Sequence, residues 1–195
     1  DHGDFIKTFA LLKDCDIRGN RVALIANAGY EKTYAADNLG RLQVARLDAP
    51  THDTLERLLP AYVNVESLLD LTPMAGDVLY GDCIRAMLQC DSVDALIISI
   101  VPHSILLHTT DDEIAQTEDH LSNRIVRLAH EFRKPIVVSV NVTFGAGAVY
   151  NRFGQILEAG GVPTFLTANR AMVCLNAFVH YHLARRQEKR DAWLA

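Results

Sequence analysis

The sequence contains no run of about 18 apolar residues, no signal peptide, and neither internal repeats nor low-complexity segments. These absences predict a cytoplasmic protein without a membrane-spanning helix. Charge of one sign is in small excess: the formal net charge is −5 over 195 residues. This balance argues against general binding of nucleic acid or of an anionic membrane surface. With 49% hydrophobic residues, the chain is predicted to bury one large globular core.

Residue patterns for covalent or metal chemistry are also scarce. The four cysteines form no C-x-x-C pair, and Cys83 and Cys90 are about 10 Å apart along one predicted helix, too far for a disulfide. Buried free thiols in a reducing compartment are therefore expected. His103 and His108 share a loop, but their spacing does not make metal ligands converge, so no metal site is predicted. No Ser-His-Asp or Cys-His arrangement suggests a nucleophile.

What the sequence does contain is a regular alternation of apolar runs and helical segments. Strands are expected at 22–26, 42–47, 93–101, 136–140 and 162–165. Helices are expected at 5–12, 30–39, 51–59, 77–90, 111–132, 149–159 and 168–186, with 62–72 irregular. This alternation predicts an α/β fold, in which a five-stranded parallel sheet of flavodoxin-like (Rossmann-type) order carries helices on both faces.

Three segments are distinguished along the chain. They are an N-terminal linker helix (1–17), the flavodoxin-like domain (18–183) and a C-terminal linker or tail (184–195). Within the domain, Thr51 or Asp53 and, further along, Asp77 are predicted to cap helix N-termini, because their side-chain oxygens suit that position.

Ligands of open parallel sheets bind beyond the carboxyl ends of the strands. The segments expected to reach that edge are 27–31, 67–76, 102–108, 141–147 and 166–168. The first of them, Asn27-Ala28-Gly29, turns a strand into a helix, whose first N–H groups are suited to an anion. The stretch is neither G-x-G-x-x-G nor a Walker motif, and Glu31 in the first turn would repel phosphate. A purely structural turn is therefore the alternative at this point.

Four further residues are candidates for the same ligand edge. Glu31 lies in the first turn of the helix, Asp70 and Thr72 approach the turn at 73–76, and His103 follows the third strand. The competing interpretation is that such polar side chains bond the loop backbone. The residues alone thus indicate a scaffold with a ligand edge and no self-evident catalytic machinery.

Taken in series, several stretches resemble a known family. They are RGNRVALIANAG, LDLTPMAGD, VDALIISIVP, KPIVVSV and GGVPTFLTANRAMVCLNAFV. Their order and spacing are similar to the succinyl-CoA-synthetase-like flavodoxin domain of the NDP-forming acyl-CoA synthetases, of the ADP-forming acetate–CoA ligase type. The resemblance extends over nearly the whole chain.

The resemblance implies a part in a multidomain ligase that converts an acid, CoA and an NTP into acyl-CoA, NDP and phosphate through a phosphohistidine. The implied partners are a CoA-binding and phosphohistidine domain and an ATP-grasp domain, in the same protein or in a partner subunit. The parent enzyme would use CoA, ATP or another NTP, and Mg. The motif that carries the phosphohistidine is absent from this chain, so the fragment alone is not expected to be active.

The resemblance also implies a role for one helix end. Asn27, Ala28, Gly29 and Tyr30 match the residues at which such domains face the phosphohistidine of another domain. Two departures accompany this match. Most members have a second glycine where this chain has Tyr30, and often a small residue in place of Glu31. The family's Asn-Pro-x-Asp-Leu-Thr stretch appears here as SLLDLT (67–72), without the Asn-Pro. A non-catalytic flavodoxin-like module that binds a small ligand or docks a partner is the alternative.

Overall fold

The computed structural model describes residues 2–142 and 147–194. The strands are β1 (Arg21–Ala26), β2 (Gln43–Val44), β3 (Leu68–Asp70), β4 (Ala95–Ile100), β5 (Ile136–Val140) and β6 (Thr164–Phe165). The helices are α1 (His2–Leu11), α2 (Gly29–Ala36), α3 (Ala49–Leu58), α4 (Asp77–Gln89), α5 (Asp111–Gln116), α6 (Leu121–Phe132), α7 (Asn151–Ala159) and α8 (Ala168–Leu194), with a 3₁₀ turn, η1 (Gly147–Tyr150).

All strands of the sheet are parallel, in the order β2-β1-β4-β5-β6. The predicted α/β fold and its flavodoxin-like strand order are confirmed. The predicted number of five strands is wrong, because β3 also pairs with β1. β2 pairs with the start of β1 at Arg21 and Val22, whereas β3 pairs with its second half from Leu24. Two short strands therefore share one edge of β1: β2 lies within the strand predicted over 42–47, and β3 lies within the segment 62–72 predicted to be irregular.

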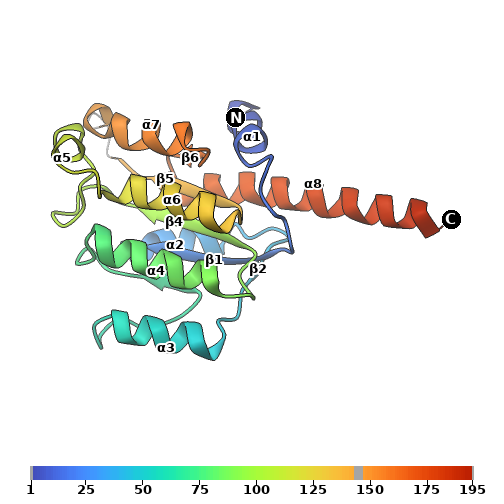
Figure 1. Cartoon of the computed structure of the whole chain (residues 1–195), viewed down its shortest axis with the longest axis horizontal. Helices are drawn as coiled ribbons and strands as arrows, with labels where there is room; N and C mark the ends of the chain where they lie inside the picture. The colour runs from blue at the N-terminus through green and yellow to red at the C-terminus, as the bar shows by residue number, and fades with distance from the viewer. Residues whose placement is uncertain (1, 143–146, 195) are drawn as a thin grey trace.

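Helices cover both faces of this sheet (Figure 1), and a hydrophobic core lies on each face. Residues of α3, α4, α6 and α7 pack on one face against alternate strand residues such as Ile25 and Ile98. Residues of α2 and α8 pack on the other face against Leu24 and Ile97. Both faces of the central strands are buried, which explains why their sequences are continuous apolar runs rather than alternating ones.

The helix predicted over 111–132 is two helices, α5 and α6, so that prediction is wrong. Thr117 has extended backbone angles (φ −148°, ψ 141°) and ends α5. His120 then caps α6, because its Nδ1 accepts a hydrogen bond from the N–H of Asn123 at 3.4 Å. A side-chain cap of this kind supplies a partner for a backbone donor that would otherwise be unsatisfied at a new helix start.

Two predicted N-caps are also corrected. The cap of α3 is Asp48 rather than Thr51 or Asp53, and its carboxylate accepts from the N–H of Thr51 at 2.9 Å. Asp77 is the first residue of α4, and Gly76 occupies the cap position. The side chain of Asp77 is consequently available for contacts with other elements.

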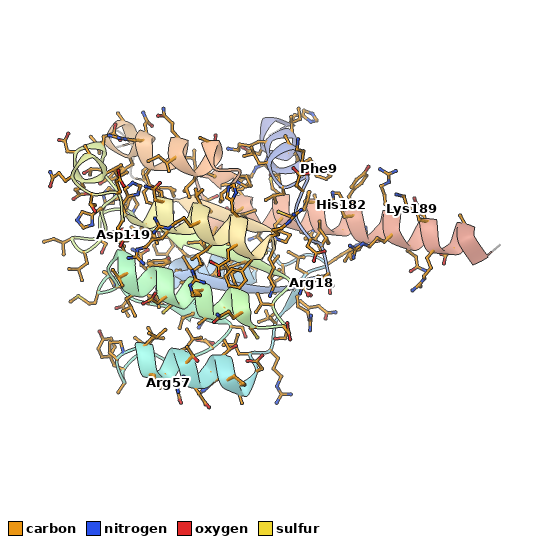
Figure 2. The ribbon with its side chains drawn as sticks, viewed as in Figure 1. Phe9, Arg18, Arg57, Asp119, His182 and Lys189 are labelled. Carbon is orange, nitrogen blue, oxygen red and sulfur yellow. The ribbon has the colours of Figure 1, made fainter. Side chains whose placement is uncertain are left out.

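The segment predicted as a linker helix packs against the last helix. The ring centroids of Phe9 (α1) and Phe178 (α8) are 5.2 Å apart, and Phe9 also stacks near His182 at 6.2 Å (Figure 2). α8 continues to Leu194, beyond its predicted end, and its last turns project from the body (Figure 1). The predicted domain limits stay a prediction. None of the described helices has both the length and the apolar character that crossing a membrane requires.

Candidate functional site

The site is the carboxyl edge of the sheet, and Asn27 joins two strand ends there. Its side chain is buried (2% exposed). Its Nδ2 donates to the carbonyl of Val101 at 2.9 Å, and its Oδ1 accepts from the Val101 N–H at 2.8 Å. The amide therefore ties the end of β1 to the end of β4. Because both polar atoms of the Asn27 side chain are already bonded to Val101, a ligand at this edge would contact Asn27 through its backbone groups.

α2 begins directly after Asn27, and no side chain caps its first turn. Ala28 is its N-cap in an extended conformation and makes no side-chain capping bond. Gly29 and Tyr30 are exposed, and their N–H groups are the donors that a helix start leaves without intrahelical partners. These donors, together with the helix dipole, make the end of α2 suited to an anionic group.

Glu31, the third residue of α2, turns inward instead of facing the solvent. Its side chain is 1% exposed. One carboxylate oxygen accepts from Ser99 Oγ (β4) at 2.7 Å and the other from Asn141 Nδ2 at 2.6 Å, and Ser139 Oγ (β5) donates to Ser99 Oγ at 2.7 Å. The carboxylate lies below the helix end, bonded to two neighbouring strands.

Tyr30 completes this arrangement. Burial, and after it the neighbouring Glu31 carboxylate, raises the pKa of Tyr30 to about 12. The hydroxyl therefore stays protonated at neutral pH. Its ring, 46% exposed, contacts that of Tyr34 edge-on at 6.2 Å.

Asp70 and Thr72 meet the start of α2 from β3. Asp70 Oδ1 accepts from the N–H of Thr72 at 2.9 Å, and Thr72 has a left-handed backbone (φ 62°). A Cβ atom at Gly29 would lie 3.1 Å from Asp70 Oδ2. Glycine is thus what permits the carboxylate of Asp70 to approach the helix end so closely. The structure brings Asp70 beside Gly29, and the bond from the Thr72 N–H to Asp70 is the loop-backbone contact of the competing interpretation; a role of these residues in ligand binding stays a prediction.

His103 lies apart from that cluster. Its Nδ1 is 2.8 Å from the hydroxyl of Tyr150 in η1, and the two rings meet edge-on at 5.4 Å. The neighbouring loop, 141–147, was also expected at this edge; of it, residues 143–146 lie outside the described ranges. His103 therefore belongs to the part of the edge formed by η1 and α7.

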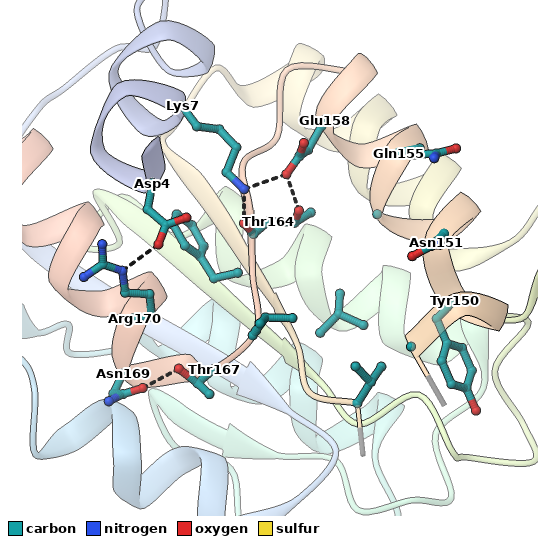
Figure 3. Close-up of a pocket in the computed structure, with 16 residues that line it drawn as sticks. Asp4, Lys7, Tyr150, Asn151, Gln155, Glu158, Thr164, Thr167, Asn169 and Arg170 are labelled. Carbon is teal, nitrogen blue, oxygen red and sulfur yellow. Dashed lines mark hydrogen bonds and ion pairs between the residues drawn. The ribbon is translucent and has the colours of Figure 1, made fainter. Parts of the chain in front are cut away.

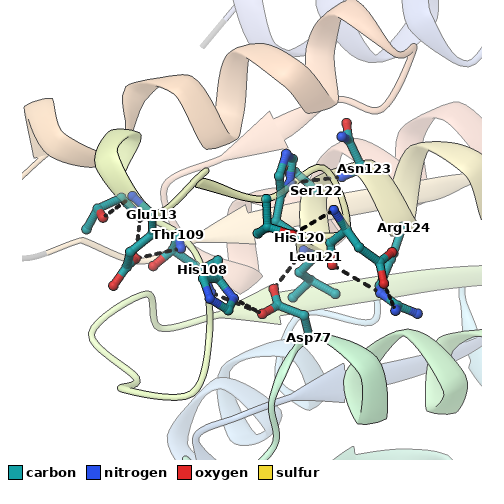
Figure 4. Close-up of polar contacts among 12 residues, drawn as sticks. Asp77, His108, Thr109, Glu113, His120, Leu121, Ser122, Asn123 and Arg124 are labelled. Atoms are coloured by element: carbon teal, nitrogen blue, oxygen red, sulfur yellow. Dashed lines mark hydrogen bonds and ion pairs between the residues drawn. The ribbon is translucent and has the colours of Figure 1, made fainter. Parts of the chain in front are cut away.

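A second polar cluster was not predicted from the sequence (Figure 4). Asp77, 6% exposed, accepts from the N–H of Leu121 at 2.7 Å and bonds His108 Nδ1 at 2.6 Å. It thereby holds the loop after β4 and the start of α6 to α4. His120 is buried beside it, and this burial lowers its pKa. Neither histidine has a local sequence pattern that indicates Asp77, since the three residues come from separate segments.

An open cavity lies at the other end of the edge (Figure 3). A cavity of about 650 Å³ is formed by α1, α7, β6 and the start of α8. On its wall Lys7 Nζ pairs with Glu158 at 2.7 Å and donates to the Thr164 carbonyl at 2.6 Å, while Arg170 Nε pairs with Asp4 at 2.7 Å. No local sequence pattern indicates this cavity, because it forms only when α1 packs against α8.

Comparison with known proteins identifies the relatives of this fold. The alpha subunit of acetate–CoA ligase [ADP-forming] II from Pyrococcus furiosus is 31% identical to the chain over 153 residues. The chain is a homologue of this subunit. The match covers 76% of the chain but only 31% of the subunit. The resemblance predicted from the motif series is confirmed, although no protein-family model matches the chain.

Solved structures of other proteins share the fold. The crystal structure of PH0766 from Pyrococcus horikoshii OT3 has a TM-score of 0.72 at 24% identity, covering 90% of this chain and 39% of that one. The apo form of the dinucleotide forming acetyl-coenzyme A synthetase 1 from Ca. Korarchaeum cryptofilum has a TM-score of 0.77 at 19% identity, covering 96% of this chain and 38% of that one. The same synthetase in complex with phosphate and ADP gives 0.77 at 18% identity.

Proposed function

We propose that the chain is one domain of an NDP-forming acyl-CoA synthetase, which converts an acid, CoA and an NTP into acyl-CoA, NDP and phosphate. In this proposal the phosphoryl group is carried by a histidine in another domain. The chain contributes the N-terminus of α2 to that site, through Asn27, Ala28, Gly29 and Tyr30. Its similarity to the acetate–CoA ligase alpha subunit supports a place in such an enzyme.

One structural observation supports the role of α2. The helix starts at the carboxyl edge with an extended Ala28, an exposed Gly29 and no side-chain cap. Its first N–H groups therefore point toward whatever docks at this edge, and a phosphoryl group carries the negative charge that they favour. On this basis the helix end lowers the free energy of the phosphorylated histidine while that histidine faces it.

The proposal includes the cofactors and partners of the parent enzyme. CoA, ATP or another NTP, and Mg would be bound by a CoA-binding and phosphohistidine domain and an ATP-grasp domain. The structural relative in complex with phosphate and ADP is in keeping with this chemistry. A cytoplasmic location is part of the proposal and is supported by the four free cysteines.

Gly29→Val in the full-length parent enzyme tests the proposed function. The branched side chain would cover the N–H groups of the first turn and push against Asp70, so we expect turnover to fall at least about tenfold, as when a preorganised donor is lost. Gly3→Val is the matched control, because nothing lies within 4 Å of a Cβ atom at Gly3. Unchanged turnover in a folded Gly29→Val enzyme would refute the role of α2.

A second candidate function is a non-catalytic module that binds a small ligand or docks a partner. It is favoured by the carboxylates of Glu31 and Asp70 at the α2 end and by the cavity at the α8 end. Calorimetric titration of the chain with phosphate, CoA, nucleotides and FMN distinguishes ligand binding from docking. Saturable binding of one compound at the cavity, together with a parent protein that lacks ligase activity, would favour this candidate.

A further inference from the structure

Among the buried carboxylates of the described residues, Glu31 differs in having no cationic partner there. Asp94 is 1% exposed and is paired with the guanidinium of Arg21 at 2.8 Å. Asp77 contacts the imidazole of His108 at 2.6 Å. Within residues 2–142 and 147–194, no lysine, arginine or histidine nitrogen forms an ion pair with Glu31. The described donors to its carboxylate, Ser99 and Asn141, are neutral.

Those donors form a compact set at the end of the sheet. Ser99 and Ser139 are fully buried on neighbouring strands β4 and β5, and Asn141 follows β5 directly. Together they direct a hydroxyl and an amide N–H at one carboxylate, and the second serine supports the first. Buried polar groups persist only when they are hydrogen-bonded. The set is therefore a built anion site, and the anion that occupies it is a side chain of the same molecule.

We propose that Glu31 is the resident anion of this edge and the residue that determines how weakly the end of α2 binds phosphate. This inference rests on the proposed function, because it concerns the same helix end. The carboxylate of Glu31 accepts the hydrogen bonds of the buried donors Ser99 and Asn141 and places a negative charge between the first turn of α2 and the sheet. A phosphoryl group that approaches the N–H groups of Gly29 and Tyr30 is consequently repelled by this charge.

Asp70 acts in the same direction from the side. Its Oδ2 lies within 3.1 Å of the position of a Cβ atom on Gly29, so a second carboxylate borders the helix end. At an effective dielectric constant of about 20, repulsion between neighbouring unit charges is worth more than tenfold in affinity. Glu31, being buried, is screened less by salt than the half-buried Asp70. We therefore expect Glu31 to have the larger effect of the two.

Titration of the whole chain with inorganic phosphate, followed by ³¹P NMR and calorimetry, tests the inference. We expect Glu31→Ala to bind phosphate at least about tenfold more tightly than the wild-type chain, with Asp70→Asn giving a smaller gain. Glu188→Ala is the matched control, because it removes the same charge from an exposed turn of the projecting end of α8 (Figure 1). A folded Glu31→Ala variant with wild-type phosphate affinity would overturn the inference.

Two further variants show where the additional phosphate binds and keep the test valid if Glu31→Ala does not fold. Adding Gly29→Val to Glu31→Ala is expected to abolish the gained binding, because it covers the end of α2; persistence of that binding would place the phosphate elsewhere and overturn the inference. If Glu31→Ala fails to fold, Glu31→Gln keeps the shape of the side chain and removes only its charge. A folded Glu31→Gln variant without any gain would overturn the inference as well.

The binding test is independent of catalysis by the parent enzyme. Phosphate affinity is measured on the chain itself, whereas the proposed function depends on turnover of the full-length protein with Gly29→Val. A gain in phosphate binding by Glu31→Ala, combined with undiminished turnover in Gly29→Val, would refute the proposed function and keep the inference. The opposite pair of results would refute the inference and keep the proposed function.

Discussion

The two ends of the carboxyl edge are built in opposite ways. At the α2 end, Asn27 and Glu31 are buried and their polar atoms bond to β4, β5 and the residues that follow these strands. At the α8 end, partly exposed ion pairs such as that of Lys7 with Glu158 line a cavity of about 650 Å³. At the α2 end the polar side chains are bonded to one another and to the backbone, whereas the α8 end contains an open cavity. The sequence motifs predict a site at the α2 end, but the cavity that could hold a small ligand lies at the α8 end.

This contrast predicts where substitutions are costly. A buried side chain that bonds to backbone leaves unsatisfied groups when it is removed, at about 1–3 kcal/mol for each group. A partly exposed ion pair contributes about 1 kcal/mol at most, because water and salt screen it. We therefore expect the α2 end to be sensitive to substitution and the α8 end to be tolerant.

The largest effect is expected for Asn27→Ala. The change removes both bonds to the backbone of Val101 and should lower the free energy of unfolding by about 2–4 kcal/mol. Asn169→Ala is the control at the other end; its amide oxygen accepts from the exposed Thr167 hydroxyl, so the loss should stay below about 0.5 kcal/mol. Urea denaturation measures both changes. Equal losses in the two variants would contradict the contrast between the ends.

Ser99→Ala should have the next largest effect. The Ser99 hydroxyl donates to Glu31 and accepts from Ser139. Its removal leaves the buried Ser139 hydroxyl without this acceptor, whereas the Glu31 carboxylate keeps its bond from Asn141, so the loss should be about 1–3 kcal/mol. Ser139→Ala removes only the outer bond and should cost less. Thr164→Val at the cavity, where the hydroxyl bonds the half-buried Glu158, provides a matched hydroxyl deletion. Thermal unfolding followed by circular dichroism would contradict this ranking if Thr164→Val proved the most costly.

The central strands could be predicted from the sequence, whereas the direction of Glu31 could not. β1, β4 and β5 are buried on both faces, and a continuous run of β-branched and other apolar residues reports that burial directly. Glu31, by contrast, finds its partners 68 and 110 residues further along the chain, at Ser99 and Asn141. No local pattern encodes such contacts, so the sequence predicts only that a charge in the first turn of the helix lies at the ligand edge.

The missed elements have the same cause. β3 contains only Leu68, Leu69 and Asp70, and it is a strand because β1 offers a free edge after Val22, where β2 ends. The break between α5 and α6 depends on His120, whose residue type does not by itself indicate a helix start. Its imidazole accepts a hydrogen bond from the backbone N–H of Asn123. The cavity depends on α1, which the amphipathic pattern identified as a helix without indicating that it packs on α8.

A smaller effect, on the pH dependence of stability, is expected for substitution of His120. Burial lowers its pKa in the folded chain below 6.5, so the unfolded chain binds the proton more readily and stability falls as the pH drops below 6.5. His120→Asn keeps a capping oxygen at the start of α6 but cannot be protonated. The variant should therefore lose less stability than the wild type between pH 7.5 and pH 5.5, as measured by urea midpoints. Identical pH profiles would contradict a buried, neutral His120.

The smallest effect is expected at the cavity, for Lys7→Met. The side chains of Lys7 and Glu158 are 27% and 38% exposed, so a double-mutant cycle with Glu158→Gln should give a coupling energy below about 1 kcal/mol. Burial would raise the pKa of Glu158, but the bonds from Lys7 and Thr164 outweigh it and hold the pKa below 4.5. The coupling is therefore present above pH 4.5 and is lost as the pH falls through the folded pKa. A coupling energy as large as the loss of unfolding free energy in Asn27→Ala would mean that the polar contacts at the α8 end stabilise the fold as strongly as those at the α2 end.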